Sequence, residues 1–186
     1  MKQGDHRALA HYLLRGAGTS GIWAYGRNRR AFVLGCVCPD YLPTTYLRGF
    51  GRSHAMRGHH ALYSAAHVKR ILRRLESEGI RTVRDCYALG SLIHYLADSF
   101  THVHNESFKG DMREHRLYEA YLHRHFTRYL RRIELCEPSK FSPDQPPQEH
   151  WYRVRRSYEN AEEGLERDCR AIVDACRSVF FTLCGI

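Results

Sequence analysis

Three histidines, an aspartate and a glutamate lie within the apolar segment HYLADSFTHVHNE, residues 94–106. His94 and Asp98 are four residues apart, so on a helix they project from one face about one turn apart. At that separation an imidazole and a carboxylate can share one cation. His102 continues the same row, and His104 lies to its other side near the end of the segment. The segment therefore carries the ligand types of a metal site.

A second pair with the same spacing follows this segment. His115 and Glu119 are also four residues apart. One such pair is weak support for a metal site, because a chain with 13 histidines supplies it by chance. Two helices that each present an imidazole and a carboxylate inward can form a metal site in a helical bundle. The two pairs together predict a metal cluster between helices.

Three further candidate ligands lie upstream. Asp40 follows a proline in a loop-like stretch, and His54 comes fourteen residues later. His11 lies among apolar residues near the start of the chain. Each has an ordinary alternative, because a single histidine on an apolar helix is more often a hydrogen-bonded core or boundary residue. They can act as ligands of the same site only if the fold brings them close to the two later pairs.

The elements that must position these residues are helical, because apolar residues recur every three or four positions and no stretch alternates like a strand. An apolar run covers residues 31–38, and we expect helices over 5–15, 55–77, 82–104, 112–133 and, as one long closing helix, 151–183. The segment 134–150 holds four of the six prolines, which predicts a linker or surface loop. The sequence predicts one all-α domain over residues 1–186, a multi-helix bundle with a metal cluster between helices.

Charge and cysteine usage set broad limits. The chain has 29 Lys and Arg against 20 Asp and Glu, a net charge of +9. This favours an anionic partner such as phosphate, nucleic acid or lipid headgroups, although a solvated basic face gives the same composition. Seven scattered cysteines, an odd number, favour core thiols in a reducing compartment over a disulfide framework. With no convincing signal peptide and no apolar run of about 20 residues, we expect a cytoplasmic protein without a transmembrane segment.

The candidate ligands resemble those of the bacterial zinc-dependent phospholipases C, whose wider relatives include fungal zinc nucleases that cut single strands. The similarity is most specific in HYLADSFTHVHN, where the family has a comparable HYL-x-D segment followed by a histidine and an asparagine. Helical phase favours His102 as the third ligand there, whereas the family spacing favours His104. The matching positions, in the family's order, are His11, Asp40, His54, His94, Asp98, His104, His115 and Glu119.

The resemblance implies two or three Zn²⁺ ions. It assigns the first zinc to Asp40, His54, His94 and Asp98. It assigns the second to His104, His115 and Glu119. A third zinc would share Asp98 and take His11, and in the family it also binds the amine and carbonyl of an N-terminal Trp, which this chain lacks. Either the backbone of the first residues or His6 fills that gap, or the third site is weak or absent.

The resemblance also implies an activity, that of a zinc-dependent phosphoric diester hydrolase of the phospholipase C type. Zinc with an open coordination position lowers the pKa of bound water toward neutrality, so a zinc-bound hydroxide would attack the phosphodiester. Asp40 matches the family carboxylate proposed to help activate this water and is the expected catalytic residue. The partner would be a phospholipid headgroup or another small molecule that contains a phosphodiester.

Two other classes of function remain open. The first is a zinc-dependent nuclease or phosphatase on the same scaffold, which the net charge of +9 favours. The second is a non-catalytic helical protein that binds metal. Metal content separates the non-catalytic protein from the enzymes, and a panel of phosphatidylcholine, a chromogenic phosphodiester and single-stranded DNA separates the enzymes from each other. The chain is shorter than the secreted phospholipases C it resembles, so a small soluble phosphodiester is also a candidate substrate.

Overall fold

Helices form in most of the segments where apolar residues recur every three or four positions. The computed structural model describes residues 1–41, 61–105, 107–135 and 147–186. In these residues there is no strand, so the all-α prediction is confirmed. The α-helices are α1 (Gln3–Ala17), α2 (Gly26–Val37), α4 (Ala61–Glu78), α5 (Val83–Ser99), α6 (Met112–Leu135), α7 (Pro147–Asn160) and α8 (Leu165–Cys184). The short 3₁₀ helices are η1 (Gly21–Ala24), η2 (Cys38–Asp40) and η3 (His102–His104).

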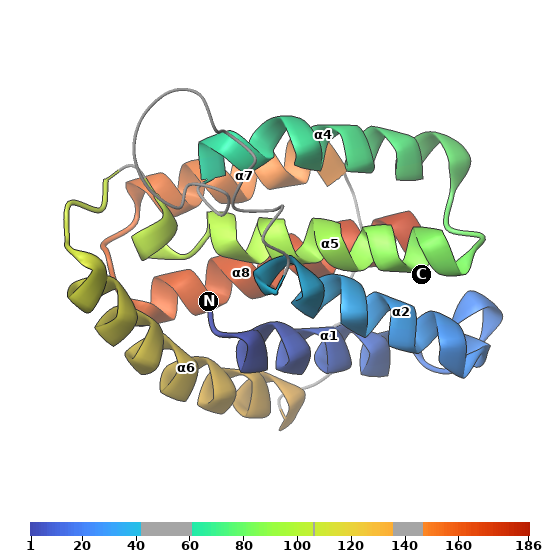
Figure 1. The fold of residues 1–186 in the computed structure, drawn as a ribbon, viewed down its shortest axis with the longest axis horizontal. Helices are drawn as coiled ribbons and strands as arrows, with labels where there is room; N and C mark the ends of the chain where they lie inside the picture. The colour runs from blue at the N-terminus through green and yellow to red at the C-terminus, as the bar shows by residue number, and fades with distance from the viewer. Residues whose placement is uncertain (42–60, 106, 136–146) are drawn as a thin grey trace.

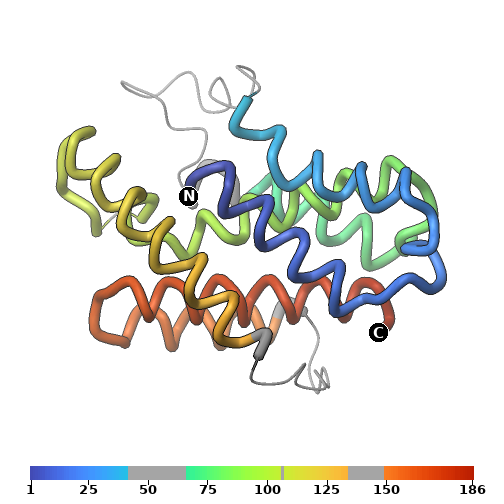
Figure 2. Tube along the Cα trace, turned by 90° about the horizontal axis from the view of Figure 1, so that it is seen from below, coloured from blue at the N-terminus to red at the C-terminus, as the bar shows by residue number. Residues whose placement is uncertain are grey.

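The helix α5 is the central element of the bundle. It contacts α2, α4 and α8, and Figure 1 shows α4 on one side of it and α1 and α2 on the other. Every residue from 89 to 100 is buried, as expected for a helix covered on all sides. In the turned view of Figure 2, α7 and α8 lie together on one side of α5, and α2 lies on the other.

One apolar core joins the seven α-helices of the described residues. Its largest fully buried side chains include Phe32 of α2, Phe126 of α6 and Phe180 of α8, together with Phe100 just after α5. The start of the chain also lies inside the bundle, because only 4 % of Met1 is exposed. The core therefore holds the first residues of the chain against α5.

Two glycines bring α2 and α5 into backbone contact. A Cβ atom added to Gly35 would overlap the carbonyl oxygen of Tyr87, and one added to Gly90 would overlap the carbonyl oxygen of Phe32. Only residues without a side chain allow this approach. The contact places the carbonyl group of Cys36 next to α5, where it meets a histidine of the candidate site.

The helix predicted over 82–104 ends earlier, at Ser99. The hydroxyls of Ser99 and Thr101 donate to the carbonyl oxygens of Leu96 and Ala97, and such bonds compete with continued helix. The backbone N–H of His102 donates to a side chain of α8 instead of to the preceding turn. Because the chain turns here, the residues after 99 fold back toward the end of α5.

The prediction of one closing helix over 151–183 is wrong, because the chain forms α7 and α8 with residues 161–164 between them. A single helix of that length would extend about 50 Å, whereas the reversal lets α7 pack along α8. The predicted loop 134–150 also ends early, because α7 begins at Pro147. Proline suits the first position of a helix, where its missing N–H has no partner to lose. Residues 136–146 lie outside the described residues.

Candidate metal centre

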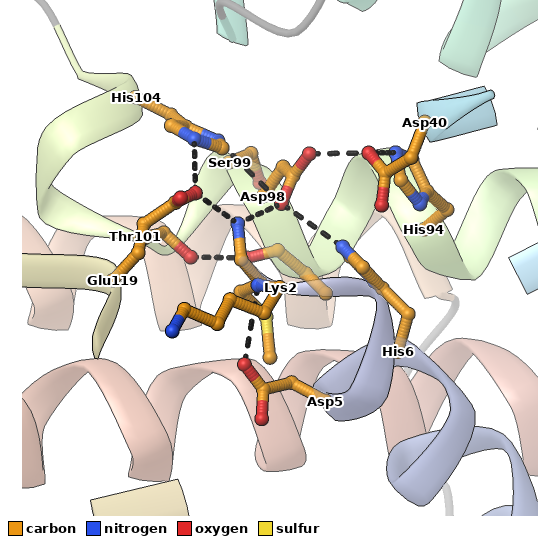
Figure 3. Close-up of polar contacts among 12 residues, drawn as sticks. Lys2, Asp5, His6, Asp40, His94, Asp98, Ser99, Thr101, His104 and Glu119 are labelled. Carbon is orange, nitrogen blue, oxygen red and sulfur yellow. Dashed lines mark hydrogen bonds and ion pairs between the residues drawn. The ribbon is translucent and has the colours of Figure 1, made fainter. Parts of the chain in front are cut away.

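Two groups of ligand-type side chains lie next to each other where α1, η2, α5, η3 and α6 meet (Figure 3). In each group the ligand atoms lie within 4.8 Å of one another. The first group consists of His6, Asp40, His94 and Asp98, and the second of His104, His115 and Glu119. Carboxylate oxygens and imidazole nitrogens together are the ligand set that zinc prefers.

The ring of His94 is held by the backbone of α2. Its Nδ1 lies 2.9 Å from the carbonyl oxygen of Cys36. A carbonyl oxygen only accepts hydrogen bonds, so Nδ1 carries the proton in neutral His94 and Nε2 presents its lone pair. That Nε2 lies 3.4 Å from Asp98 Oδ2 and 3.7 Å from Asp40 Oδ1. A backbone partner of this kind orients metal-binding histidines in general.

Asp98 connects the two groups. Its Oδ1 lies 2.9 Å from the amine of Met1, 3.3 Å from His6 Nε2 and 3.5 Å from His104 Nδ1. Burial raises the pKa of Asp98, but the positive amine and the imidazoles around it outweigh burial and hold the pKa well below its usual value. Asp98 is therefore ionised and can bridge two cations.

His6 is buried without the hydrogen bonds that an imidazole needs. Its ring stacks on that of His94 with 4.0 Å between centroids. Within the described residues, neither ring nitrogen of His6 makes a hydrogen bond, nor does His104 Nδ1, although His6 Nε2 and His104 Nδ1 lie 3.3 and 3.5 Å from Asp98 Oδ1. Leaving such groups unpaired in a core costs free energy, on the order of 1–3 kcal/mol each. A bound cation would satisfy them, so the residues present fit a metal ion.

Glu119 lies close to both histidines of the second group. Its Oε1 lies 3.4 Å from His115 Nε2 and 3.5 Å from His104 Nε2. Burial raises the pKa of Glu119, but hydrogen bonds from these two imidazoles, together with the nearby amine, lower it far more. The pKa of His104 falls to about 4, first because it is buried and second because of the amine. At neutral pH the carboxylate is charged and His104 is neutral, which are the states that metal binding requires.

The amine of Met1 lies between the groups. It is 2.9 Å from Asp98 Oδ1 and 3.2 Å from Glu119 Oε1. Burial lowers its pKa, but the two carboxylates outweigh burial and raise the pKa to about 10. Without metal, this positive charge balances the carboxylates of the site.

The structure brings six of the eight predicted site residues together and places His11 elsewhere. The side chain of His11 is exposed, and His6 of the same helix lies in the first group instead. Five residues correspond to about 140° around a helix, so His6 and His11 cannot face the same site. His6, and not His11, is therefore the α1 histidine that lies with the first group. The eighth residue, His54, lies outside the described residues.

His104, and not His102, reaches the second group. His102 points away from it, with its Nδ1 3.6 Å from Glu163 Oε1. Helical phase would favour His102 only if α5 continued through it. Because α5 ends at Ser99, the chain turns back and places His104 next to Asp98.

Sequence reasoning did not connect two supporting carboxylates with the candidate site. Asp5 accepts hydrogen bonds from the backbone N–H of Lys2 and from His123 of α6, at 3.2 and 2.6 Å, and so fixes the start of α1. His123 follows Glu119 by four residues, so the helical spacing that revealed His115 could also have revealed it. No local signal marks its partner, which lies 118 residues away.

The second supporting carboxylate, Asp168, is fully buried in α8. Its Oδ2 accepts from the His102 backbone N–H and from the Tyr118 hydroxyl, both at 2.7 Å. Its Oδ1 accepts from the Tyr158 hydroxyl at 3.0 Å. Asp168 thus joins η3 to α6, α7 and α8, and it holds the segment that carries His104.

A comparison with protein-family models matches residues 5–179 to the model described as zinc dependent phospholipase C. The chain belongs to this family. The matched range contains both groups of ligand-type side chains, and the family supports zinc as the metal and a phospholipase C-like function. Searches of curated proteins and of solved structures find no match. In the described part of the chain, no helix combines the length and the apolar character that crossing a bilayer requires.

Proposed function

We propose that this protein is a zinc-dependent hydrolase of phosphodiester bonds that acts on a phospholipid or a related headgroup ester. The observation that carries the proposal is the meeting of buried, unpaired imidazole nitrogens with ionised carboxylates in two adjacent groups joined by Asp98. A purely structural core would not gather so many groups that lose hydration on burial. Membership of the zinc-dependent phospholipase C family supports the same reading.

The ligand sets follow from the two groups. Asp40, His94 and Asp98 would hold one zinc ion, with His54 added from the family pattern. His104, His115 and Glu119 would hold a second. His6 and Asp98 would contribute to a third, in which His6 takes the role first given to His11. When bound, zinc acidifies water and neutralises the oxygens of a phosphodiester.

Asp40 is the proposed catalytic carboxylate. It lies in η2 at the edge of the first group, and its side chain keeps 16 % of its surface exposed, whereas Asp98 keeps 2 %. A carboxylate at an accessible edge can orient an attacking water molecule and accept its proton. The enclosed Asp98 suits a bridging role instead.

Elemental analysis and a substrate panel test this proposal. Purified protein should contain two or three zinc ions per chain and should hydrolyse phosphatidylcholine or a chromogenic phosphodiester. Chelation should abolish hydrolysis and added zinc should restore it. His94→Ala should lose both zinc and activity. Zinc-loaded protein that hydrolyses neither substrate would contradict the proposal, and cleavage of single-stranded DNA alone would identify a nuclease instead.

A further inference from the structure

The helix α6 presents two different faces. Its inner face carries His115 and Glu119 toward the metal centre and packs Leu122 and Phe126 into the core. Its outer face is an exposed stripe whose members lie within about 80° of one another around the helix. We call it the outer α6 stripe, and it consists of Arg113, Leu117, Tyr121, Arg124, Arg128 and Arg131.

The stripe combines positive charge with apolar surface. It contains four arginines and no acidic residue, and in the described part of the chain none of the four forms an ion pair with a carboxylate. Arg132, just beside it, does pair with Glu166. Leu117 is 51 % exposed and Tyr121 is 50 % exposed. Arginines beside exposed apolar side chains favour a lipid surface, because anionic headgroups attract the charges while apolar side chains enter the headgroup region.

A cavity of about 610 Å³ opens next to the stripe. Leu117 and Tyr121 form part of its wall, and so does Phe108. The ring of Phe108 lies 6.2 Å from that of His115, centroid to centroid. Phe108 therefore lines this cavity and also lies beside a residue of the second ligand group.

We propose that the outer α6 stripe docks the protein on the surface of an anionic phospholipid bilayer. The four arginines complement anionic headgroups, and each basic residue near such a surface strengthens binding. Leu117 and Tyr121 gain by entering the headgroup region, whereas a nucleic acid backbone would leave them in water. This inference rests on the proposed function in one respect. Docking would bring the candidate metal centre to a surface where phospholipid, the proposed substrate, is concentrated. Binding itself requires no hydrolysis.

Co-sedimentation of the full-length, zinc-loaded protein with vesicles tests the docking. Vesicles of phosphatidylcholine mixed with phosphatidylglycerol should bind the protein, pure phosphatidylcholine should bind it far less, and salt should release it. Replacing two arginines, Arg124→Gln with Arg128→Gln, should weaken binding on the order of 30-fold. Leu117→Ser with Tyr121→Ser should weaken it on the order of 10-fold or more at unchanged charge.

The matched control removes the same charge from another exposed helix surface. Arg70→Gln with Arg73→Gln on α4 should bind vesicles like the unchanged protein. Equal loss in this control and in the Arg124 and Arg128 variant would overturn the proposal, because net charge alone would then explain binding. Absence of vesicle binding would overturn it too. So would tight binding to DNA that depends on the same arginines but not on Leu117 and Tyr121.

Hydrolysis of a soluble chromogenic phosphodiester separates the docking from the activity. The stripe variants should retain this hydrolysis while they lose vesicle binding, because no stripe residue belongs to either ligand group. Vesicle binding without hydrolysis of any substrate would contradict the proposed function and leave the docking intact. Hydrolysis without vesicle binding would contradict the docking and leave the proposed function intact.

Discussion

At the scale of single residues, the metal centre depends on which nitrogen of each histidine is available. His94 Nδ1 donates to a backbone carbonyl, so its Nε2 faces the carboxylates. His6 stacks against His94 and has no hydrogen-bond partner among the described residues. A bound cation would supply the partner that the ring nitrogens lack. His6 is therefore the residue whose replacement tells most about the site.

His6→Ala should reduce zinc binding, whereas His11→Ala should leave it unchanged. Both substitutions remove an imidazole from α1, but only His6 lies with the ligand group. Loss of a direct ligand should lower zinc affinity by more than the 10- to 100-fold typical of outer partners. Competition with a chromogenic zinc chelator measures this affinity. Loss of zinc in the His11 variant, with full binding in the His6 variant, would reverse the assignment.

At the scale of elements, the contact between α2 and α5 sets the geometry of His94. Gly35 and Gly90 let the two backbones touch, and the residue after Gly35 supplies the carbonyl that holds the His94 ring. The site thus depends on two positions without side chains. The same contact ties the stability of the bundle to metal binding.

Gly90→Ala should destabilise the protein by about 1–3 kcal/mol, because the new methyl group overlaps the carbonyl oxygen of Phe32. This expected loss of stability is opposite in sign to the helix propensity of the two residues, because alanine stabilises a helix by about 1 kcal/mol relative to glycine. Gly26→Ala at the start of α2 is the control, since a Cβ there meets no atom within 4 Å. Urea unfolding measures both. A Gly90 variant as stable as the control would show that the helices do not touch here.

The N-terminus of α5 gives a pH-dependent contribution to stability. Burial raises the pKa of Asp85, but hydrogen bonds from Thr82 and Arg81, with Arg74 nearby, outweigh burial and lower the pKa below its ordinary value of 3.8. A carboxylate with a lowered pKa stabilises the fold above its unfolded pKa, and this contribution is lost as pH falls through its folded pKa.

Asp85→Asn should therefore cost about 1 kcal/mol at neutral pH. The difference between the variant and the unchanged protein should shrink once the pH falls below 3.8. Denaturant unfolding of both proteins at a series of pH values measures this difference. A difference that stays constant down to the acid limit would mean that the charge of Asp85 does not stabilise α5.

Asp168 should be the most sensitive buried polar position of α8. Asp168→Ala would remove the acceptor for the Tyr118 and Tyr158 hydroxyls and for the His102 backbone N–H. We expect a loss of about 3 kcal/mol or more in unfolding free energy and weaker zinc binding, because η3 positions His104. Asp174→Ala on the exposed side of the same helix should change little. Unchanged zinc affinity in a folded Asp168 variant would separate this network from the metal centre.

At the scale of the whole molecule, the metal centre joins distant parts of the chain. Its side chains come from α1, η2, α5, η3 and α6, so bound zinc would cross-link these segments in the folded state alone. A ligand that binds only the folded state stabilises it in proportion to the logarithm of its concentration.

Zinc at about 100 times its dissociation constant should raise the free energy of unfolding by roughly 2.7 kcal/mol relative to chelated protein. The His94→Ala variant should show a much smaller rise. Thermal unfolding with zinc and with chelator measures the effect. An equal rise in both proteins would place the stabilising zinc away from this centre.

The sequence by itself determined the helical class and the paired ligands, because helical period and four-residue spacing are local properties. His94 with Asp98, and His115 with Glu119, could be recognised in this way. Which side of a helix faces the site is not local. His6 took the place expected for His11 because tertiary packing decides how α1 is turned.

Only the tertiary structure decided where α5 ends and where the closing helix breaks. Side chains far away in sequence, such as Asp168, compete for backbone groups that a continuing helix would use. Their competition selects His104 over His102 for the metal centre. Short stretches of sequence thus indicate which types of ligand the chain carries. Which of these residues lie in the candidate metal centre depends on hydrogen bonds and backbone contacts that form only when the bundle folds.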